Sequence, residues 1–334
     1  MEPLAIISSD GSPVAFLLAF RMLATALLIM AAGAVLARFE GGSHHTTLAR
    51  LNGQVFIPCL VFSAMNRTPF QLADAAVMGL AAVVFTVCCY PLARFWTARS
   101  GDNDKTGLVS LLFSSTSTLL LPLSWLLFGS QGLSKAAAFH LVNLFIMYTW
   151  GARLAGQPSR LGAFLKKPTL HAALLAVLLQ QITPEPPQQL QELLWLVEKG
   201  IGMMAAGAVP ILLMSHGYAL YCLHSCGSSR WSGFTLARML ILMATAGLLL
   251  LLFRSTGIFS MERGYDLLSY LDMRTSEAIL LLAAALPCTL STLWYSGGAA
   301  ISRRNGSLIL ASSLLSIVAL VAVMVVINRF IFSY

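Results

Sequence analysis

The sequence predicts an all-α polytopic membrane protein, with ten transmembrane helices in two inverted five-helix repeats and proline-broken crossover helices. Composition is the first observation: 57% of the 334 residues are hydrophobic and 10% are charged, an apolar content well above that of a soluble domain. Apolar runs long enough to cross a hydrocarbon core recur along the chain. Prolines also interrupt such runs at corresponding places in the two halves of the sequence.

Polar joints, or joints that contain Gly and Pro, separate ten apolar runs of roughly the length that crosses a bilayer, about 20 residues. The second and sixth runs are the shortest. The approximate limits of the runs are 14–36, 51–65, 74–95, 106–128, 135–154, 168–182, 193–220, 234–253, 275–295 and 307–327. A joint at 156–167 divides the first five-helix repeat, 1–155, from the second, 168–334.

The distribution of basic residues predicts how the chain lies in the membrane. Most of the 21 Lys and Arg residues fall in the joints after the odd-numbered spans. Because basic residues gather on the cytoplasmic side, we predict that these joints are inside and that both termini are outside. These basic residues on the cytoplasmic side account for most of the formal net charge of +8, so no nucleic-acid partner is predicted.

Four prolines lie inside the spans in two matched pairs. Pro58 in the second span corresponds to Pro210 in the seventh, and Pro122 in the fourth corresponds to Pro287 in the ninth. Proline removes a backbone hydrogen bond that lipid cannot replace. Matched broken spans in two inverted halves are typical of secondary transporters, whose site lies between the repeats at mid-depth. We therefore predict helix breaks at these four prolines and a binding site where the fourth and ninth spans cross.

Hydroxyl side chains surround the second proline pair. Two half-helix N-termini that meet there would each carry about +0.5 charge and together balance about one anionic charge. The hydroxyl groups would then bind a carboxylate; alternatively, they bond only to the backbone of their own helices. The side chain of Asn143 either binds the substrate or forms a hydrogen bond between helices that holds the bundle together. The candidate substrate-binding residues are Ser114, Ser115, Ser117, Pro122, Asn143, Pro287, Thr289 and Ser291, with Thr116, Thr118 and Thr292 in the same clusters.

Three titratable residues are candidates for ion coupling. Asp74 and Glu277 open the third and ninth spans near the predicted outer surface, where a solvated helix N-terminus is the alternative role. His140 can titrate near neutral pH, or it is a packed residue of the bundle. The sequence contains no mid-depth carboxylate pair of the kind that strong proton or sodium coupling needs. Uniport of an anion driven by the membrane potential therefore stays open.

The sequence contains no HExxH motif, nucleophile elbow or Walker loop. A membrane-embedded enzyme would need Ser115 with His140 as its base, and nothing in the sequence brings these two together. Cys222, His224 and Cys226 lie close together with no fourth ligand, which does not favour a zinc site. We predict a protein that is not an enzyme and that has no cofactor and no metal.

Six stretches resemble the auxin efflux carrier family, which includes plant PIN-type carriers and bacterial permeases for small organic acids. They are LARLNGQVFIPCLVFSAM, STSTLLLPLSWLLFGSQG, AAAFHLVNLFIMYTWG, FLKKPTLHAALLAVLL, GMMAAGAVPILLMSHGYAL and AAALPCTLSTLWYS. The short central joint is similar to that of bacterial members. The family's fourth-helix pattern, roughly NxGxxGxP, has Ser115, Ser117 and Leu120 in place of its Asn and Gly residues here. The resemblance therefore does not fix the substrate.

The resemblance implies a permease of the cell membrane, and of a bacterial inner membrane in particular, that moves a small organic anion by alternating access. It implies a scaffold of helices 1, 2, 6 and 7, which also offers a homodimer contact, and a moving unit of helices 3–5 and 8–10. The related bile-acid sodium symporters are the main alternative. Their sodium sites need Asn, Gln or Glu at the crossing, where this sequence has hydroxyl groups.

Overall fold

A computed structural model describes residues 13–41, 44–67, 72–99, 105–182, 188–224, 232–256, 267–289 and 303–327. The α-helices are α1 (Pro13–Glu40), α2 (His45–Leu51), α3 (Ile57–Arg67), α4 (Leu72–Arg99), α5 (Lys105–Leu112), α6 (Leu121–Ile146), α7 (Ala152–Leu154), α8 (Leu161–Leu165), α9 (Pro168–Ile182), α10 (Gln188–Leu223), α11 (Ser232–Thr256), α12 (Leu267–Ala285) and α13 (Arg303–Val326). Three π-helical turns join some of them, namely η1 (Asn52–Phe56), η2 (Thr116–Leu120) and η3 (Met147–Gly151).

Within the described part of the chain, six helices are long and apolar enough to cross a membrane. They run over Phe20–Glu40, Thr46–Asn66, Ala75–Arg99, Trp195–Leu223, Gly233–Thr256 and Gly306–Val326. The chain is therefore an all-helical, polytopic membrane protein, as predicted. Four predicted spans are not among these six: the fourth and ninth are interrupted, the sixth corresponds to α9 with only 15 residues, and the fifth is divided among α6, η3 and α7. The ten-helix inverted repeat remains a prediction.

Two of the four prolines expected to break helices lie in spans that stay helical. Helix α10 continues through Pro210. Pro58 lies in the first turn of α3, directly after the wide turns of η1, and the chain is helical on both sides of it. A π-helical turn next to a proline relieves the clash between the ring and the preceding carbonyl without ending the helix. The expected breaks at Pro58 and Pro210 were therefore wrong.

Helix α6 bends sharply at Gly129, where φ is 65° and ψ is −150°. A positive φ suits glycine because it has no Cβ atom to clash with the backbone. The bend joins the second part of the interrupted fourth span directly to the fifth span. The expected joint between these two spans is thus a single bend within one helix.

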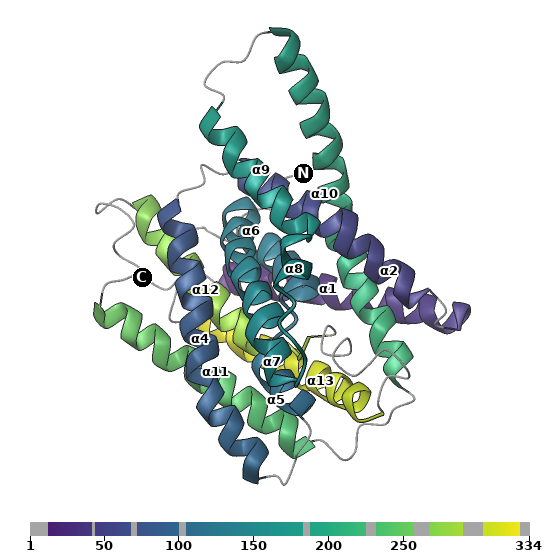
Figure 1. Cartoon of the computed structure of the whole chain (residues 1–334), viewed down its shortest axis with the longest axis vertical. Helices are drawn as coiled ribbons and strands as arrows, with labels where there is room; N and C mark the ends of the chain where they lie inside the picture. Colours follow the sequence, from purple (N-terminus) through teal and green to yellow (C-terminus); the bar gives the residue numbers. More distant parts are fainter. Residues whose placement is uncertain are drawn as a thin grey trace.

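The helices pack in two groups. Figure 1 shows α9 and α10 of the first group at the upper right, and α4, α11 and α12 of the second group toward the left. In the first group, α1 packs along α10, and α3 packs against both α9 and α10. In the second group, α4 packs against α6 and α11, and α12 packs against α6, α11 and α13. The main contacts between the groups join α10 to η2, α6 and α13, and α3 to α6. This border is where the interrupted spans meet the first group.

Two glycines hold α1 and α10 in backbone contact. A Cβ atom added at Gly33 would overlap the carbonyl oxygen of Met214, and one added at Gly217 would overlap the carbonyl oxygen of Met30. Small residues that let helix backbones approach are a common basis of helix association in membranes. The α1–α10 pair is therefore the most closely packed helix contact of the first group.

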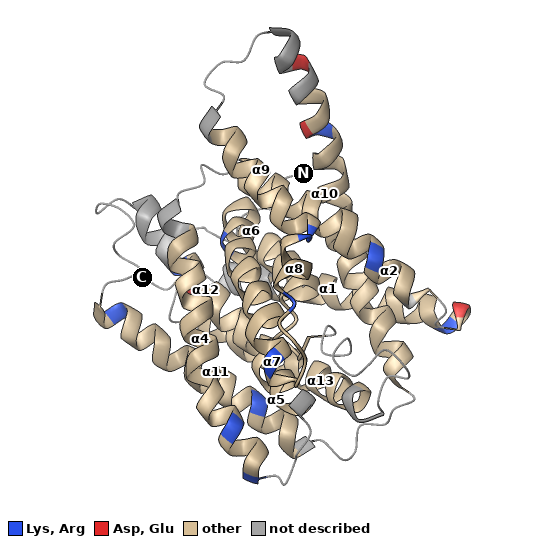
Figure 2. Cartoon of the chain, viewed as in Figure 1, with Lys and Arg blue, Asp and Glu red and all other residues tan. Residues whose placement is uncertain are grey.

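Charged side chains are sparse along the bundle. Figure 2 shows long stretches of the helices without Lys, Arg, Asp or Glu, and most of the coloured positions lie toward helix ends.

The central joint contains the short helix α8, in which Phe164 is buried against the ring of Phe145 at a centroid distance of 5.4 Å. The joint is thus packed onto the bundle.

Candidate crossover binding site

The fourth and ninth spans are interrupted at the same place in space. Helix α5 ends at Leu112 and α12 ends at Ala285, and the next residues form an isolated antiparallel bridge between Ser114 and Cys288. The N–H of Ser115 donates to the carbonyl of Pro287 at 2.9 Å, and the N–H of Thr289 donates to the carbonyl of Phe113 at 3.1 Å. Each break therefore supplies backbone partners that the other lacks, as hydrocarbon surroundings require.

Pro287 and Pro122 lie at different positions relative to the two breaks. Pro287 lies within the second break and accepts one of the bridging hydrogen bonds. Pro122 lies in the first turn of α6, after the chain has already resumed helical form in η2. Proline is well tolerated at that position because the first turn of a helix needs no N–H donor. The sequence analysis predicted a break at Pro122 itself. In the structure the break lies several residues before it.

Hydroxyl groups on α13 complete the second break. The hydroxyl of Ser316 donates to the carbonyl of Ala285 at 2.7 Å, and the N–H of Cys288 donates to the hydroxyl oxygen of Ser312 at 3.3 Å. Both serines are buried. They replace helical hydrogen bonds that the interruption removes, and sequence analysis did not single them out.

The predicted hydroxyl cluster forms connected pairs around the first break. The hydroxyl groups of Ser115 and Thr118 lie 2.6 Å apart. Thr116 lies 2.8 Å from Nδ1 of His140 and accepts a hydrogen bond of 3.4 Å from Nδ2 of Asn143. The structure thus brings Asn143 and His140 to the first break, and both are buried.

Two backbone N–H groups at the start of η2 point to a binding function. The N–H groups of Thr116, Leu119 and Leu120 bond to carbonyls of Ser114 or Ser115. Among the residues that the structure describes, no acceptor is bonded to the N–H groups of Ser117 and Thr118, and both residues are partly exposed. Unpaired N–H groups at a helix N-terminus are an anion-binding arrangement.

The carbonyl side of the crossing is occupied by a cation of the protein itself. Arg238, on α11, is fully buried. Its guanidinium donates to the carbonyl of Leu286 at 2.8 Å and to the hydroxyl of Ser114 at 2.9 Å. Arg238 is one of the basic residues that the sequence analysis assigned to the cytoplasmic joints after odd-numbered spans; the structure instead buries it at the crossing. The available signal was a charged residue inside the apolar run 234–253, which is rarely without a role.

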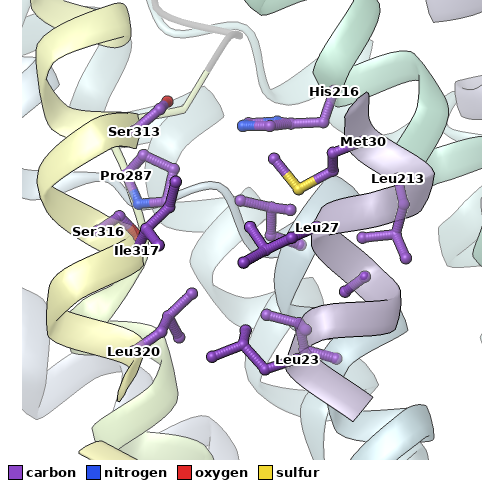
Figure 3. Close-up of a pocket in the computed structure, with 13 residues that line it drawn as sticks. Leu23, Leu27, Met30, Leu213, His216, Pro287, Ser313, Ser316, Ile317 and Leu320 are labelled. Carbon is purple, nitrogen blue, oxygen red and sulfur yellow. The ribbon is translucent and has the colours of Figure 1, made fainter. Parts of the chain in front are cut away.

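A small cavity of about 20 Å³ lies beside the crossing, between α1, α10, α6 and α13. Figure 3 shows the ring of His216 extending from α10 toward Pro287 and Ser313. Nδ1 of His216 lies 3.3 Å from the hydroxyl of Thr118, and its buried Nε2 has no hydrogen-bond partner among the described residues. Apart from His216 and two serines, apolar side chains line this space. Sequence analysis missed His216, although a histidine within an apolar span was visible.

Glu277 does not lie at a solvated helix start, as was expected. Helix α12 begins at Leu267, so Glu277 is inside the helix and fully buried. Arg254 on α11 donates two hydrogen bonds of 2.7 and 2.6 Å to its carboxylate, and Arg274 lies 3.4 Å from the same group. Next to it, buried Lys135 on α6 donates to the hydroxyl of Ser276 at 2.7 Å. Glu277 thus belongs to an interhelical charge cluster that ties α12 to α11.

Some predicted residues fall outside the part of the chain that can be described. Ser291, Thr292 and Cys226 are outside the described residues. Asp74 belongs to the first turn of α4, but its side chain is not among those described. Thr289 is buried at the bridge and contributes its backbone to it.

Comparison with known proteins gives a family match for part of the chain. Residues 18–163 match the family model described as membrane transport protein. No curated protein matches the chain. The matched residues include α5, the first break and η2. Residues 18–163, less than half of the chain, are therefore similar to a family of membrane transport proteins.

Proposed function

We propose that this membrane transporter moves a small organic anion, in particular a carboxylate, across the cell membrane by alternating access. The observation that carries the proposal is the bridged crossing of two interrupted spans, with unpaired N–H groups at Ser117 and Thr118 on its accessible side. A crossing of this kind at mid-depth is where secondary transporters bind their substrates.

The charges around the crossing favour an anion. The half-helix that begins at η2 presents about +0.5 charge at its N-terminus. The hydroxyls of Ser115 and Thr118 stand beside the free N–H groups and can donate to a carboxylate. Arg238 balances the negative ends of α5 and α12 on the other side of the bridge. An anion at the crossing would thus be attracted by the positive N-terminus at η2. It would not be repelled by the C-termini of α5 and α12, because Arg238 neutralises them.

The size of the cavity supports a moving arrangement of the helices. A space of about 20 Å³ holds about one water molecule, which is far less than an organic acid needs. Substrate entry therefore requires the cavity walls to separate. Met30 on α1 and His216 on α10 form one wall, and Ser313 and Ile317 on α13 form part of the other.

We assign the two packed helix groups the roles of scaffold and transport unit. The proposed scaffold contains α1, α3, α9 and α10, which include spans 1, 2, 6 and 7, and it offers a homodimer contact. The proposed transport unit contains α4, α5, α6, α11, α12 and α13. The packing partners support this division, since each group packs mainly within itself. Ten spans in two inverted repeats, with both termini outside the cytoplasm, belong to the same proposal.

Sodium-coupled symport of the bile-acid type is the second candidate function. The crossing contributes hydroxyl groups, the imidazoles of His140 and His216 and the amide of Asn143. This set is poorer in carboxylate and amide ligands than sodium prefers. His140 is the coupling candidate that contacts the first break, whereas Glu277 is engaged by two arginines. Transport without sodium is therefore the favoured form.

The test is uptake into proteoliposomes of radiolabelled mono- and dicarboxylates, with pH, sodium and voltage gradients imposed separately. We expect saturable uptake of at least one acid. Ser115→Ala and Thr118→Ala should lower it about tenfold, since a lost hydrogen bond to a charged group costs roughly 1.5–3 kcal/mol. Thr256→Ala is the matched control, because its exposed hydroxyl bonds only to the carbonyls of Leu252 and Phe253 in α11.

Two results would count against the proposal. Folded wild-type protein that takes up no anion under any gradient would remove the substrate class. Full uptake by both Ser115→Ala and Thr118→Ala would place the binding site elsewhere.

A further inference from the structure

Arg238 sits where the carbonyl ends of two interrupted helices converge. Its guanidinium is completely buried, and it reaches across the bridge to both of them. The oxygen acceptors are the carbonyls of Ser110 at 3.1 Å, Leu286 at 2.8 Å and Phe113 at 3.5 Å, and the hydroxyl of Ser114 at 2.9 Å. Ser110, Phe113 and Ser114 belong to the fourth span, and Leu286 belongs to the ninth.

The groups around Arg238 are those that coordinate a hard cation. Carbonyl and hydroxyl oxygens surround it, and its remaining contact is the sulfur of Met239 at 3.8 Å. Within the described part of the chain, no carboxylate pairs with Arg238. In broken-helix transporters, unwound carbonyls and half-helix C-termini are the groups that hold the coupling cation. The chain therefore builds a cage of oxygen atoms and fills it with its own side chain.

The charges of this cage balance. The C-termini of α5 and α12 each carry about −0.5 charge, so together they offset about one positive charge. A monovalent cation at this point satisfies both helix ends. The guanidinium also fits the cage in shape, because its planar fork of donors serves several oxygens at once.

We propose that Arg238 is a built-in substitute for a coupling cation at the crossing, an inference that rests on the transport function proposed above. Its positive charge and fixed donors hold the two interrupted spans together in every transport state. The carrier consequently needs neither sodium nor another soluble cation at this position to bind and move its anion. Arg238 is a positioning residue, since its contacts are with the crossing and not with the unpaired N–H groups of Ser117 and Thr118.

The first test is uptake by Arg238→Ala in proteoliposomes with choline, sodium or guanidinium as the cation. Removal of the side chain leaves buried carbonyls without partners, so uptake in choline should fall at least about tenfold. Millimolar guanidinium chloride, far below denaturing concentrations, should restore uptake several-fold, and sodium should do so in part. Wild-type uptake should be the same in all three cations.

Arg238→Lys is the second variant. It keeps the charge but not the fork of donors, so we expect reduced uptake that is still independent of sodium. Arg99→Ala is the matched control, because Arg99 is an exposed arginine at the end of α4. Neither uptake by this control nor its response to guanidinium should differ from the wild type.

A measurement without substrate separates this inference from the transport proposal. Guanidinium or sodium should raise the unfolding temperature of purified Arg238→Ala by a few degrees, as binding to a vacant site does. The same salts should not raise that of the wild type or Arg99→Ala relative to choline. If this pattern appears while wild-type protein moves no anion, the proposed substrate fails and the role of Arg238 stands.

Three outcomes would overturn the inference. Wild-type uptake that requires sodium is one. A folded Arg238→Ala variant whose uptake and unfolding temperature do not respond to either cation is the second. If the Arg238→Ala variant does not fold even in guanidinium, the test rests on Arg238→Lys. In that case the third contradicting outcome is a folded Arg238→Lys variant that takes up no anion or takes it up only with sodium.

Discussion

At the scale of single residues, Thr116 is the centre of the first break. Its hydroxyl meets the imidazole of His140 and the amide of Asn143, and all three side chains are buried. Removing a buried partner leaves the remaining polar groups unsatisfied, which costs more than the hydrogen bond itself contributes. Thr116 should therefore matter more for stability than hydroxyls that bond only within their own helix.

We expect Thr116→Val to lower the free energy of unfolding by about 1–3 kcal/mol, because His140 and Asn143 lose their common partner. Thr86→Val is the matched control. Thr86 is equally buried, but its hydroxyl donates only to the carbonyl of Ala82 in α4. Thermal unfolding of the purified variants measures the difference. Equal losses for both substitutions would mean that the contacts of Thr116 are dispensable.

The same scale shows what sequence analysis could reach. Apolar patterning placed Ser115 and Pro287 at the breaks, because prolines and hydroxyl groups inside an apolar run are visible locally. The role of Arg238 was missed, since counting basic residues near span ends cannot show that a side chain turns inward to distant carbonyls. Glu277 was misplaced for a similar reason: its partner Arg254 lies on another helix. Contacts between distant segments decide such positions.

At the scale of the elements, the α1–α10 pair depends on backbone contact. Gly33 and Gly217 lie where a methyl group would overlap a carbonyl oxygen of the other helix. Rigid backbone cannot yield to such an overlap as a side chain can. The seam between these helices is therefore intolerant of even the smallest added side chain.

Gly217→Ala should lower the free energy of unfolding by about 1–3 kcal/mol, through forced separation of the two backbones. Gly207→Ala on the same helix is the control. The nearest atom to a Cβ there is Cδ1 of Ile211 at 4.0 Å, so the gain in helix propensity should leave stability unchanged or improved. Thermal unfolding in detergent compares them. A Gly217→Ala variant as stable as Gly207→Ala would contradict the close contact.

Helix ends were the least predictable feature of the elements. The chain remains helical through Pro210, whereas the actual break near the fourth-span proline begins at Phe113, ahead of Pro122. A proline signals that a helix is disturbed, but surrounding contacts decide where and whether it opens. The bridge to Cys288 stabilises the opening at Ser114. Among the described residues, no comparable bridge lies beside Pro210 in α10.

At the scale of the whole molecule, the proposed motion separates α1 and α10 from α13. Met30 and Ile317 face the same cavity from opposite groups, whereas Met30 and Leu213 face it from within one group. A link across the border between the groups should stop the motion, and a link inside the scaffold should not.

We expect a short bifunctional maleimide to block anion uptake by a Met30→Cys and Ile317→Cys double variant in a background without its native cysteines. The matched control is the Met30→Cys and Leu213→Cys pair, whose cross-link joins α1 to α10. Mass spectrometry verifies each link, and uptake is measured before and after. Continued uptake by fully linked Met30→Cys and Ile317→Cys protein would rule out relative movement of these two helices.

The bridge between Ser114 and Cys288 also has a consequence for biogenesis. The first break receives its backbone partner from a segment that the ribosome makes much later. Until α11 and α12 enter the bilayer, the nascent chain holds an open peptide segment that neither lipid nor its own helix can satisfy. Completion of the crossing is thus a late event of synthesis, and a chain truncated before α11 would offer quality-control proteases an unfinished helix.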